Sequence, residues 1–274
     1  MDRPGLRGSL AYLATAYARR KTGLDVRLFY AEGARTREAG SLHLAESPTF
    51  EWTAPTIARW KPDMADRLDM YRDWWFHQHT PKPGDTVVDI GAGIGDDAIL
   101  FSRTVGPTGR VLSVEAHPFT YQLLKRNRDR NDLKNVTVEH LALMDKDGFV
   151  AIDERTKYET NTITHANGQN GTAHQVPACS LDDLCARHKI DRIDFLKINI
   201  EGAERFAIKG MTRMIDRTSA LCIACHDFIG ERDEFYRTKA LVVDFLKSNG
   251  FTIALREQHS DPWVSDHVYG IRSR

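Results

Sequence analysis

The chain has 274 residues, and its 38 lysines and arginines balance 38 aspartates and glutamates, so its formal net charge at pH 7 is zero. This length suits one large domain with an extension, and it allows a substantial buried core. The balanced charge, without a basic stripe, argues against a nucleic-acid partner. No apolar run approaches the roughly 20 residues of a membrane-spanning helix. The four cysteines are too few for a disulfide framework and predict a reducing, cytoplasmic setting.

Residues 1–80 show helical and turn signals without a convincing series of strands, so we predict a largely helical N-terminal extension or cap. Near its start, Leu10, Leu13, Ala14 and Tyr17 recur at helical spacing before a basic cluster. This pattern fits a helix packed on the domain, or an amphipathic helix at a membrane surface or on a partner.

Aromatic residues gather in the second half of this extension. They are Trp60, Tyr71, Trp74, Trp75 and Phe76. Such side chains usually bury area against the main domain, and they also fit the floor of an acceptor pocket. The turn cluster at residues 81–84 then separates an extension, residues 1–80, from a main domain, residues 81–274.

A glycine-rich turn follows the first predicted strand of the main domain, Thr86–Ile90, at residues 91–95. Glycine lets a ligand approach the backbone closely, so the G-x-G-x-G turn predicts a nucleoside-binding site. A dinucleotide site needs a small residue where this chain has Asp96, and that acid with Asp97 would repel a pyrophosphate. The acidic rim instead suits a cofactor with a cationic amino-acid tail, such as S-adenosylmethionine.

From residue 85 onward, predicted strands and helices alternate, which implies a mostly parallel sheet with helices on both faces. The predicted strands are Thr86–Ile90, Arg110–Val114, Val136–Leu141, Ile193–Ile198, Ala220–Ala224, Phe251–Leu255 and His267–Ile271. The predicted helices are Asp97–Val105 (N-capped by Asp96 or Asp97), Pro118–Arg130, Ala203–Met214 and Glu234–Ser248, the last with Leu241, Val242, Phe245 and Leu246 toward the core. The last two strands follow each other without a helix and should form an antiparallel hairpin. Between the predicted strands Val136–Leu141 and Ile193–Ile198, residues 148–178 break the alternation. This segment has two short predicted strands around the loop Asn161–Gly171.

Several motifs follow one another between residues 83 and 226. They are PGDTVVDIGAGIG at 83–95, GRVLSVEAHP at 109–118, the residues Tyr121, Leu124, Asn127 and Asn131, then Ala142 with Asp145 and Gly148, SLDDL at 180–184, and DFLKINIEGAE at 194–204. Together they resemble the FkbM family of S-adenosylmethionine-dependent O-methyltransferases, and the last motif is the most specific. The resemblance implies a Rossmann-like class I methyltransferase fold of seven strands, S-adenosyl-L-methionine as cofactor, and methyl transfer to an alcohol oxygen.

The resemblance also implies where the cofactor lies. Glu115 ends the second strand, 22 residues after Gly93, where an acid can accept from both ribose hydroxyls. Asp89 is expected to reach the methionine end, or merely to support the glycine turn. The adenine ring is expected at the end of the third strand. The full set of expected cofactor-binding residues is Asp89, Gly91, Ala92, Gly93, Gly95, Glu115, Ala116, Leu141 and Ala142.

The expected catalytic residues are His226, Asn199 and Glu201. His226 follows a central strand and fits a general base oriented by Asp227 or Glu201, although a purely structural histidine is the alternative. Asn199 stands where the family usually has aspartate, and its amide cannot act as a base. It can hold the methionine amino group or orient the acceptor hydroxyl. Glu201 is expected to line the site, and Glu204 less so, since acids are favoured at a helix start anyway.

The resemblance implies no metal, and we expect none, although Asn199, Glu201 and Asp227 carry oxygens suited to a hard cation. Cys222 and Cys225 have the spacing of a metal half-site. They lie in a predicted buried strand, however, where their side chains point to opposite faces, so they are predicted to be core thiols.

The leading hypothesis is O-methylation of a saccharide or another small natural-product alcohol. The zero net charge suits a neutral acceptor, and the tryptophans and histidines of residues 52–80 suit stacking on a sugar ring. One alternative is a binding module of this fold without turnover, favoured by Asn199 and by Ala224, which stands where the family often has glutamate. The other is an NAD-dependent oxidoreductase, against which Asp96 argues. The sequence leaves association into a homo-oligomer open.

Overall fold

The computed structural model describes residues 28–31, 34–39, 42–47, 50–54, 64–153, 173–230 and 233–272. The predicted first helix, Trp60 and the loop Asn161–Gly171 lie outside the described residues. The described helices include none with the length and apolar character needed to cross a membrane.

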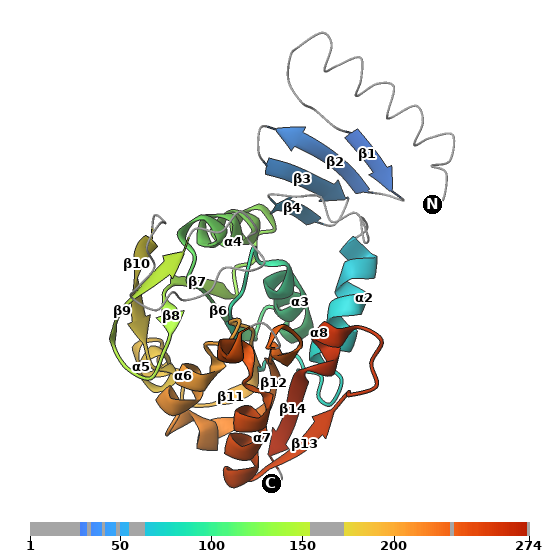
Figure 1. Cartoon of the computed structure of the whole chain (residues 1–274). Helices are drawn as coiled ribbons and strands as arrows, with labels where there is room; N and C mark the ends of the chain where they lie inside the picture. Colours follow the sequence, from blue (N-terminus) through green and yellow to red (C-terminus); the bar gives the residue numbers. More distant parts are fainter. Residues whose placement is uncertain are drawn as a thin grey trace.

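A seven-stranded sheet forms the centre of the main domain, as the alternating pattern predicts (Figure 1). Its strand order is β13-β14-β12-β11-β5-β6-β7. The strands are β5 Thr86–Ile90, β6 Arg110–Glu115, β7 Val136–His140, β11 Ile193–Ile198, β12 Thr218–Ala224, β13 Phe251–Leu255 and β14 His267–Arg272. β14 is antiparallel to β12 and β13, which confirms the closing hairpin, and the remaining pairs are parallel. The chain order changes direction between β5 and β11, where open sheets of this type bind ligands.

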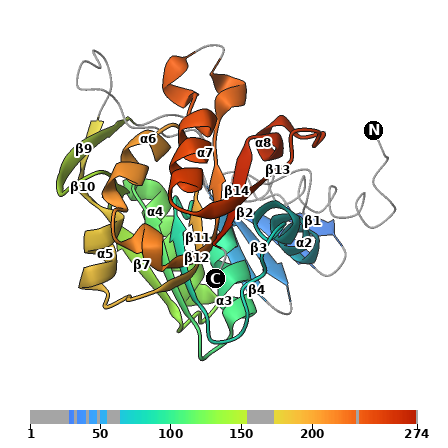
Figure 2. The same cartoon turned by 90° about the horizontal axis from the view of Figure 1, so that it is seen from below.

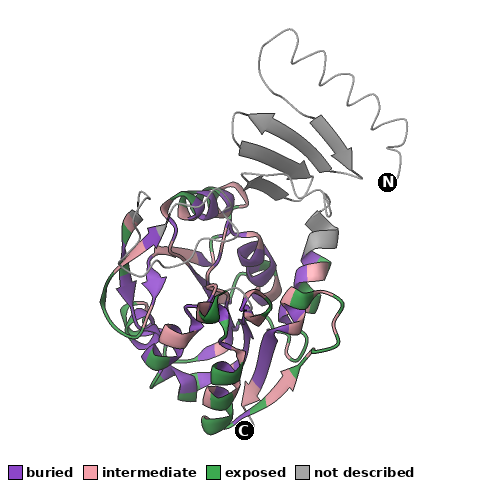
Figure 3. Cartoon of the chain, in the orientation of Figure 1, coloured by how far each residue is buried: buried purple, intermediate pink, exposed green. Residues whose placement is uncertain are grey.

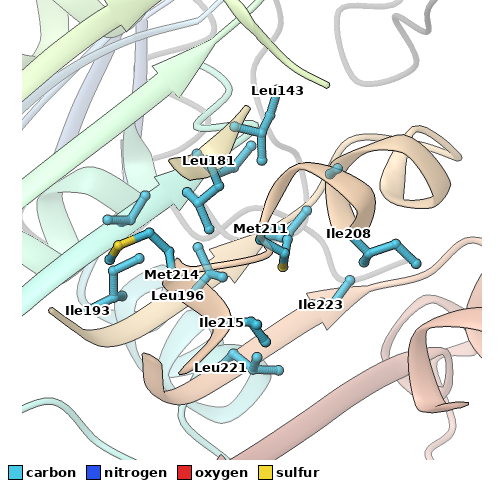
Figure 4. Close-up of a cluster of buried hydrophobic side chains, with 14 of the residues drawn as sticks. Leu143, Leu181, Ile193, Leu196, Ile208, Met211, Met214, Ile215, Leu221 and Ile223 are labelled. Atoms are coloured by element: carbon cyan, nitrogen blue, oxygen red, sulfur yellow. The ribbon is translucent and has the colours of Figure 1, made fainter. Parts of the chain in front are cut away.

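Helices cover both faces of the sheet and enclose two hydrophobic cores (Figures 1 and 2). One core receives α2 Met64–Trp75, α3 Asp96–Val105 and α4 Pro118–Arg130; the other receives α5 Leu181–Arg187, α7 Lys239–Ser248 and the segment after α6 Glu204–Ala207. Alternate strand residues point to opposite cores, as Val87 and Val88 do on β5. Figure 3 shows the central strands as mostly buried, and Figure 4 shows part of the second core around Leu196 and Met211.

Two smaller sheets accompany the central one. β8 Ala142–Leu143, β9 Gly148–Asp153 and β10 Ala173–Cys179 form a sheet in the order β8-β10-β9, which confirms the short strands predicted there. β1 Leu28–Ala31, β2 Ala34–Ala39, β3 Leu42–Ser47 and β4 Phe50–Ala54 form an antiparallel sheet in sequence order.

The N-terminal sheet corrects one prediction. A largely helical extension is wrong for the described part of residues 28–54, although α2 is helical as expected. The strand formers of β1 to β4 are two threonines and four aromatic residues, concentrated in β1 and β4, so β2 and β3 give little strand signal by propensity. Another signal was the presence of glycine-containing pairs between these segments, Glu32-Gly33 and Gly40-Ser41. Such two-residue connections are typical of hairpin turns.

Helix boundaries required further corrections. The N-cap of α3 is Gly95, and neither Asp96 nor Asp97 holds that place. The predicted helix over residues 203–214 is only α6, followed by two 3-10 turns, Ile208–Gly210 and Met214–Arg217. The predicted helix over residues 234–248 is divided into a 3-10 turn, Glu234–Tyr236, and α7.

The division before α7 has a local cause. The carboxylate of Asp227 accepts from the backbone N–H groups of Thr238 and Lys239, each at 2.9 Å, and so fixes the start of α7 there. Val242 and Leu246 face the core as predicted, whereas Leu241 is 45% exposed.

A row of polar side chains crosses the face of the sheet that α2 and α3 cover. Lys197 on β11 is in register with Asp89 on β5, and Asp89 is in register with Ser113 on β6. Lys197 Nζ lies 3.0 Å from Asp89 Oδ1 and 3.2 Å from Asp97 Oδ2 of α3, and it donates to the Gly91 carbonyl at 2.7 Å. The Lys197 and Asp89 side chains are completely buried.

The ammonium of Lys197 stays charged in this site. Burial disfavours its charged form, but the carboxylates of Asp89 and Asp97 outweigh burial and raise the pKa of Lys197 above its ordinary value. The Trp75 ring lies 5.0 Å from Lys197 Nζ, and Trp75 Nε1 donates to Asp97 Oδ1 at 2.7 Å. One cation therefore joins the end of α2, the start of α3 and the glycine turn.

The glycine turn also touches the end of β11. Gly91 has φ of +72°, and a Cβ built on it would lie 1.8 Å from the Asn199 carbonyl oxygen. The Asn199 N–H donates to the Ile90 carbonyl at 3.0 Å, so the ends of β5 and β11 are in direct contact. Only glycine fits at position 91.

We expect Lys197→Met to lower the free energy of unfolding by roughly 3–5 kcal/mol, because it leaves Asp89 and Asp97 buried without their cation. Chemical denaturation measures the change. The double variant Lys197→Met/Asp89→Asn should recover part of the loss, and Lys146→Met, at an exposed position, should change stability by less than about 0.5 kcal/mol. Wild-type stability in Lys197→Met would contradict this role.

Gly91→Ala should lower the free energy of unfolding by at least about 2 kcal/mol, since the new methyl group meets the backbone of Asn199 and the left-handed conformation penalises alanine. The matched control is Gly148→Ala. Gly148 is exposed, and a Cβ there would meet no atom within 4 Å. Equal thermal melting curves for the two variants would show that the turn tolerates a side chain.

Candidate active site

A cavity of about 630 Å³ opens at the carboxyl ends of β5, β6 and β11, beside the change in strand order. It brings together most of the residues expected from the sequence. Those expected at the cofactor are Gly91, Ala92, Gly93, Glu115, Ala116, Leu141 and Ala142, and those expected to be catalytic are Asn199, Glu201 and His226; all of them line the cavity.

Glu115 fixes the shape of the glycine turn. Its Oε2 accepts from the Gly93 N–H at 2.9 Å, and its Oε1 accepts from the His117 N–H at 2.8 Å. Burial raises the pKa of the Glu115 carboxyl to about 7, against the effect of these two hydrogen bonds. A Cβ on Gly93 would meet no atom within 4 Å, so this part of the turn faces open space next to the carboxylate. A ribose can approach both the carboxylate and the backbone here.

Motif residues on α4 support the same turn. Asn127 is fully buried, and its Nδ2 donates to the Ile94 carbonyl at 2.8 Å. Tyr121 stacks on His140 with ring centroids 4.8 Å apart, and His140 Nε2 lies 3.1 Å from the Ala116 carbonyl oxygen. These contacts hold the ends of β6 and β7 where the adenine ring is expected.

Two of the expected cofactor residues have other roles. Asp89 is buried behind the turn and does not line the cavity, because its carboxylate pairs with Lys197. It supports the turn, as the second interpretation of this residue held, and does not reach the methionine end. Gly95 also lies outside the cavity lining. A Cβ on it would lie 2.8 Å from Leu124 Cδ1, so Gly95 allows α3 to pack against α4.

The loop after β11 presents Asn199 and Glu201 to the cavity. The side-chain oxygen of Asn199 is buried and accepts no hydrogen bond from the described residues. Glu201 has φ of +53°, and Gly202 after it has φ of +95° with the Phe235 ring against its Cα. This tight turn places two polar side chains beside the glycine turn of β5.

His226 follows β12 and is 4% exposed. Its Nδ1 lies 3.8 Å from Glu204 Oε1, and Glu204 is itself fully buried. Glu204 also accepts from the Gly202 N–H at 2.8 Å and from Thr238 Oγ1 at 3.2 Å. The carboxylate facing His226 is thus Glu204. The expectation that Asp227 orients His226 is wrong, because its carboxylate caps α7.

Aromatic side chains form another wall of the cavity. Tyr71, Trp74 and Trp75 come from α2, and Trp263 comes from α8 Pro262–Ser265, which lies beside α2 in both views (Figures 1 and 2). Trp263 packs edge-on against Trp74 and Trp75, with ring centroids 4.5 and 5.5 Å apart. Phe76 instead lies in the hydrophobic core.

Sequence reasoning did not identify Lys197, Phe228, Asp261 or Trp263 as residues of the site. The last three line the cavity from segments after β12 and β13, where no motif marks them. A tryptophan after a proline in a segment expected to be a loop was the only local signal for Trp263.

The described residues include no group of three or more His, Cys, Asp or Glu side chains that could hold a metal ion. Asp227, one of the three candidate ligands, is occupied at the start of α7 and does not line the cavity. Cys222 and Cys225 are buried, free thiols in opposite hydrophobic cores, which confirms their prediction as core residues.

Comparison with known proteins finds methyltransferases. The Methyltransferase FkbM domain model matches residues 89–253, more than half of the chain. The chain is 36% identical over 75 residues to an arsenite methyltransferase of Halobacterium salinarum, covering 26% of this chain and 19% of that protein. It is 22% identical over 153 residues to the hexuronic acid methyltransferase AglP of Haloferax volcanii, covering 54% of this chain and 59% of that protein.

Among solved structures, an FkbM methyltransferase from Methylobacillus flagellatus is similar with a TM-score of 0.49 and 21% identity, covering 71% of this chain and 45% of that one. The chain spans only 17% to 37% of the length of the first curated relatives that it matches.

The family match and the cavity agree on the cofactor. The acid at the end of β6, the glycine turn without side chains and the apolar end of β7 fit a nucleoside, and S-adenosyl-L-methionine is the cofactor of this class I methyltransferase fold. The chain belongs to the FkbM methyltransferase family.

Proposed function

We propose that this chain is an O-methyltransferase that moves the methyl group of S-adenosyl-L-methionine to a hydroxyl of a saccharide or another small natural-product alcohol. The observation that carries the proposal is His226, a buried histidine that lines the cavity with a carboxylate, Glu204, 3.8 Å from its Nδ1. A histidine so placed can take a proton from an alcohol.

The bound cofactor supplies a methyl group activated by a sulfonium. That methyl group would pass to the acceptor oxygen by an in-line displacement, with S-adenosylhomocysteine as the leaving group. His226 Nε2 takes the hydroxyl proton, because Nδ1 faces Glu204, and the Glu204 carboxylate stabilises the resulting imidazolium. Asn199 supplies an acceptor for the hydroxyl or for the amino group of the cofactor, which gives its buried oxygen a donor. Alignment of the reacting atoms supplies much of the acceleration.

The saccharide class is supported by the aromatic wall. Tyr71, Trp74 and Trp263 offer flat apolar surfaces beside polar side chains, an arrangement that binds the apolar face and the hydroxyls of a sugar ring together. The relative from Haloferax volcanii is named as acting on a hexuronic acid, so one similar protein methylates a sugar derivative.

We expect His226→Ala to lower the rate of methyl transfer by about 10²- to 10⁴-fold, because the acceptor proton loses its base. Affinity for S-adenosylhomocysteine should stay within about twofold, since His226 is not among the expected cofactor contacts. His188→Ala, a half-buried histidine at the end of α5, is the control. Near wild-type turnover of labelled cofactor in His226→Ala would remove His226 as the base. Cofactor binding without transfer to any acceptor would favour the binding-module alternative.

The affinity for S-adenosylhomocysteine should rise with pH. Only ionised Glu115 can accept from both ribose hydroxyls, and the pKa of this carboxyl is raised to about 7, so the competent form disappears as the pH falls through that value. Calorimetry at pH 6 should give a Kd about tenfold higher than at pH 8.

The variant Glu115→Gln separates this effect from other titrating groups. It should bind S-adenosylhomocysteine at least about tenfold more weakly at pH 8, and its affinity should vary little with pH. A wild-type Kd that is equal at pH 6 and pH 8, or an unchanged affinity in Glu115→Gln, would contradict the ribose assignment.

A further inference from the structure

The charged side chains of the cavity lining are all acidic. They are Asp96, Asp97, Glu115, Glu201 and Asp261, and no lysine or arginine lines the cavity in the described part of the chain. Lys197 offsets Asp97 from behind, at 3.2 Å. The bound cofactor adds one positive charge at its sulfonium, since its amino and carboxyl groups cancel. Burial raises the pKa of Asp97 and of Glu115 to about 7, so the negative field inside the cavity rests on Asp96, Glu201 and Asp261.

Two of these acids are hydrogen-bonded to residues of the aromatic wall. Asp96 accepts from the Tyr71 hydroxyl at 2.5 Å, and Asp261 accepts from the backbone N–H of Trp263 at 3.0 Å, where it caps α8. Asp96, the first residue of α3, and Asp261, the N-cap of α8, therefore line the same cavity as the tryptophans of α2 and α8. Carboxylates in such a place accept from hydroxyls and attract ammonium groups.

An acceptor with a carboxylate or phosphate meets the opposite situation. It would bring a like charge into this acidic cavity, and the described lining offers no lysine or arginine with which to pair it. Among the described residues of the lining, His117 and His226 are those that can become cationic, and the proposed mechanism needs His226 without its proton.

From this lining we infer that the acceptor is an uncharged or amino-bearing saccharide and that uronic acids and sugar phosphates are excluded. This inference rests on the proposed function and narrows its substrate class. The inferred acceptor differs in charge from the hexuronic acid named for the Haloferax volcanii relative.

The test uses sets of saccharides that share one scaffold and differ in one group: a hexoside, its 2-amino analogue and its uronic acid. Binding to the complex of the full chain with S-adenosylhomocysteine is measured by calorimetry, and methyl transfer is measured with labelled cofactor. We expect the uronic acid to bind at least about tenfold more weakly than the neutral parent, and the amino sugar at least as tightly as the parent. The difference should shrink as the salt concentration rises.

Asp261→Asn keeps an oxygen to cap α8 but removes the charge, so it should reduce the discrimination against the uronic acid at least about threefold. Asp261→Lys should reduce it further. Asp191→Asn, an exposed acid before β11, should leave it unchanged. Thermal melting confirms that each variant is folded.

The outcomes separate the two proposals. If uronic acids bind as tightly as the neutral saccharides with the same scaffold, the inferred charge rule, that the cavity excludes anionic acceptors, is overturned, whether or not methyl transfer occurs. Discrimination by charge without transfer to any acceptor keeps the charge rule and overturns the O-methyltransferase assignment. Binding of no saccharide in any set overturns the acceptor class itself.

Discussion

The buried ammonium of Lys197 is the interaction on which the rest of the site depends. It lies in the centre of the sheet, and it contacts a carboxylate from the neighbouring strand, a carboxylate from α3 and the carbonyl of Gly91. A buried charge is costly unless it is paired and hydrogen-bonded, so this arrangement tolerates little displacement. The glycine turn, the start of α3 and the end of α2 are therefore positioned by one group.

This shared support links the two halves of the cavity. Trp75 lines the cavity with the aromatic wall, and it also donates to Asp97, which in turn pairs with Lys197. A movement of α2 that displaced the wall would disturb the ion pair beneath the glycine turn. In the proposed function, the cofactor and the acceptor would lie against elements that share this buried ion pair, which suits a reaction whose acceleration depends on alignment.

The sequence predicted the sheet well because its buried strands are short apolar runs that alternate with helices, as in Thr86–Ile90 and Ile193–Ile198. The role of Asp89 was harder to predict, since it depends on the register between two strands far apart in the chain. A lysine within an apolar strand was the signal, because such a charge requires a buried carboxylate. Trp263 reaches the cavity through tertiary packing on α2, which no local pattern encodes.

Asn199 stands where the family usually has an acid, but Glu204 places a carboxylate near His226 instead. An amide at the end of β11 cannot take a proton, but the loop that it begins brings Glu204 to 3.8 Å from His226. The same carboxylate holds the loop by accepting from the Gly202 N–H and from Thr238. In the proposed mechanism, the negative charge that stabilises protonated His226 comes from the fully buried Glu204, where it acts more strongly than an acid exposed to the cavity. A neutral residue at position 199 is therefore compatible with the proposed methyl transfer.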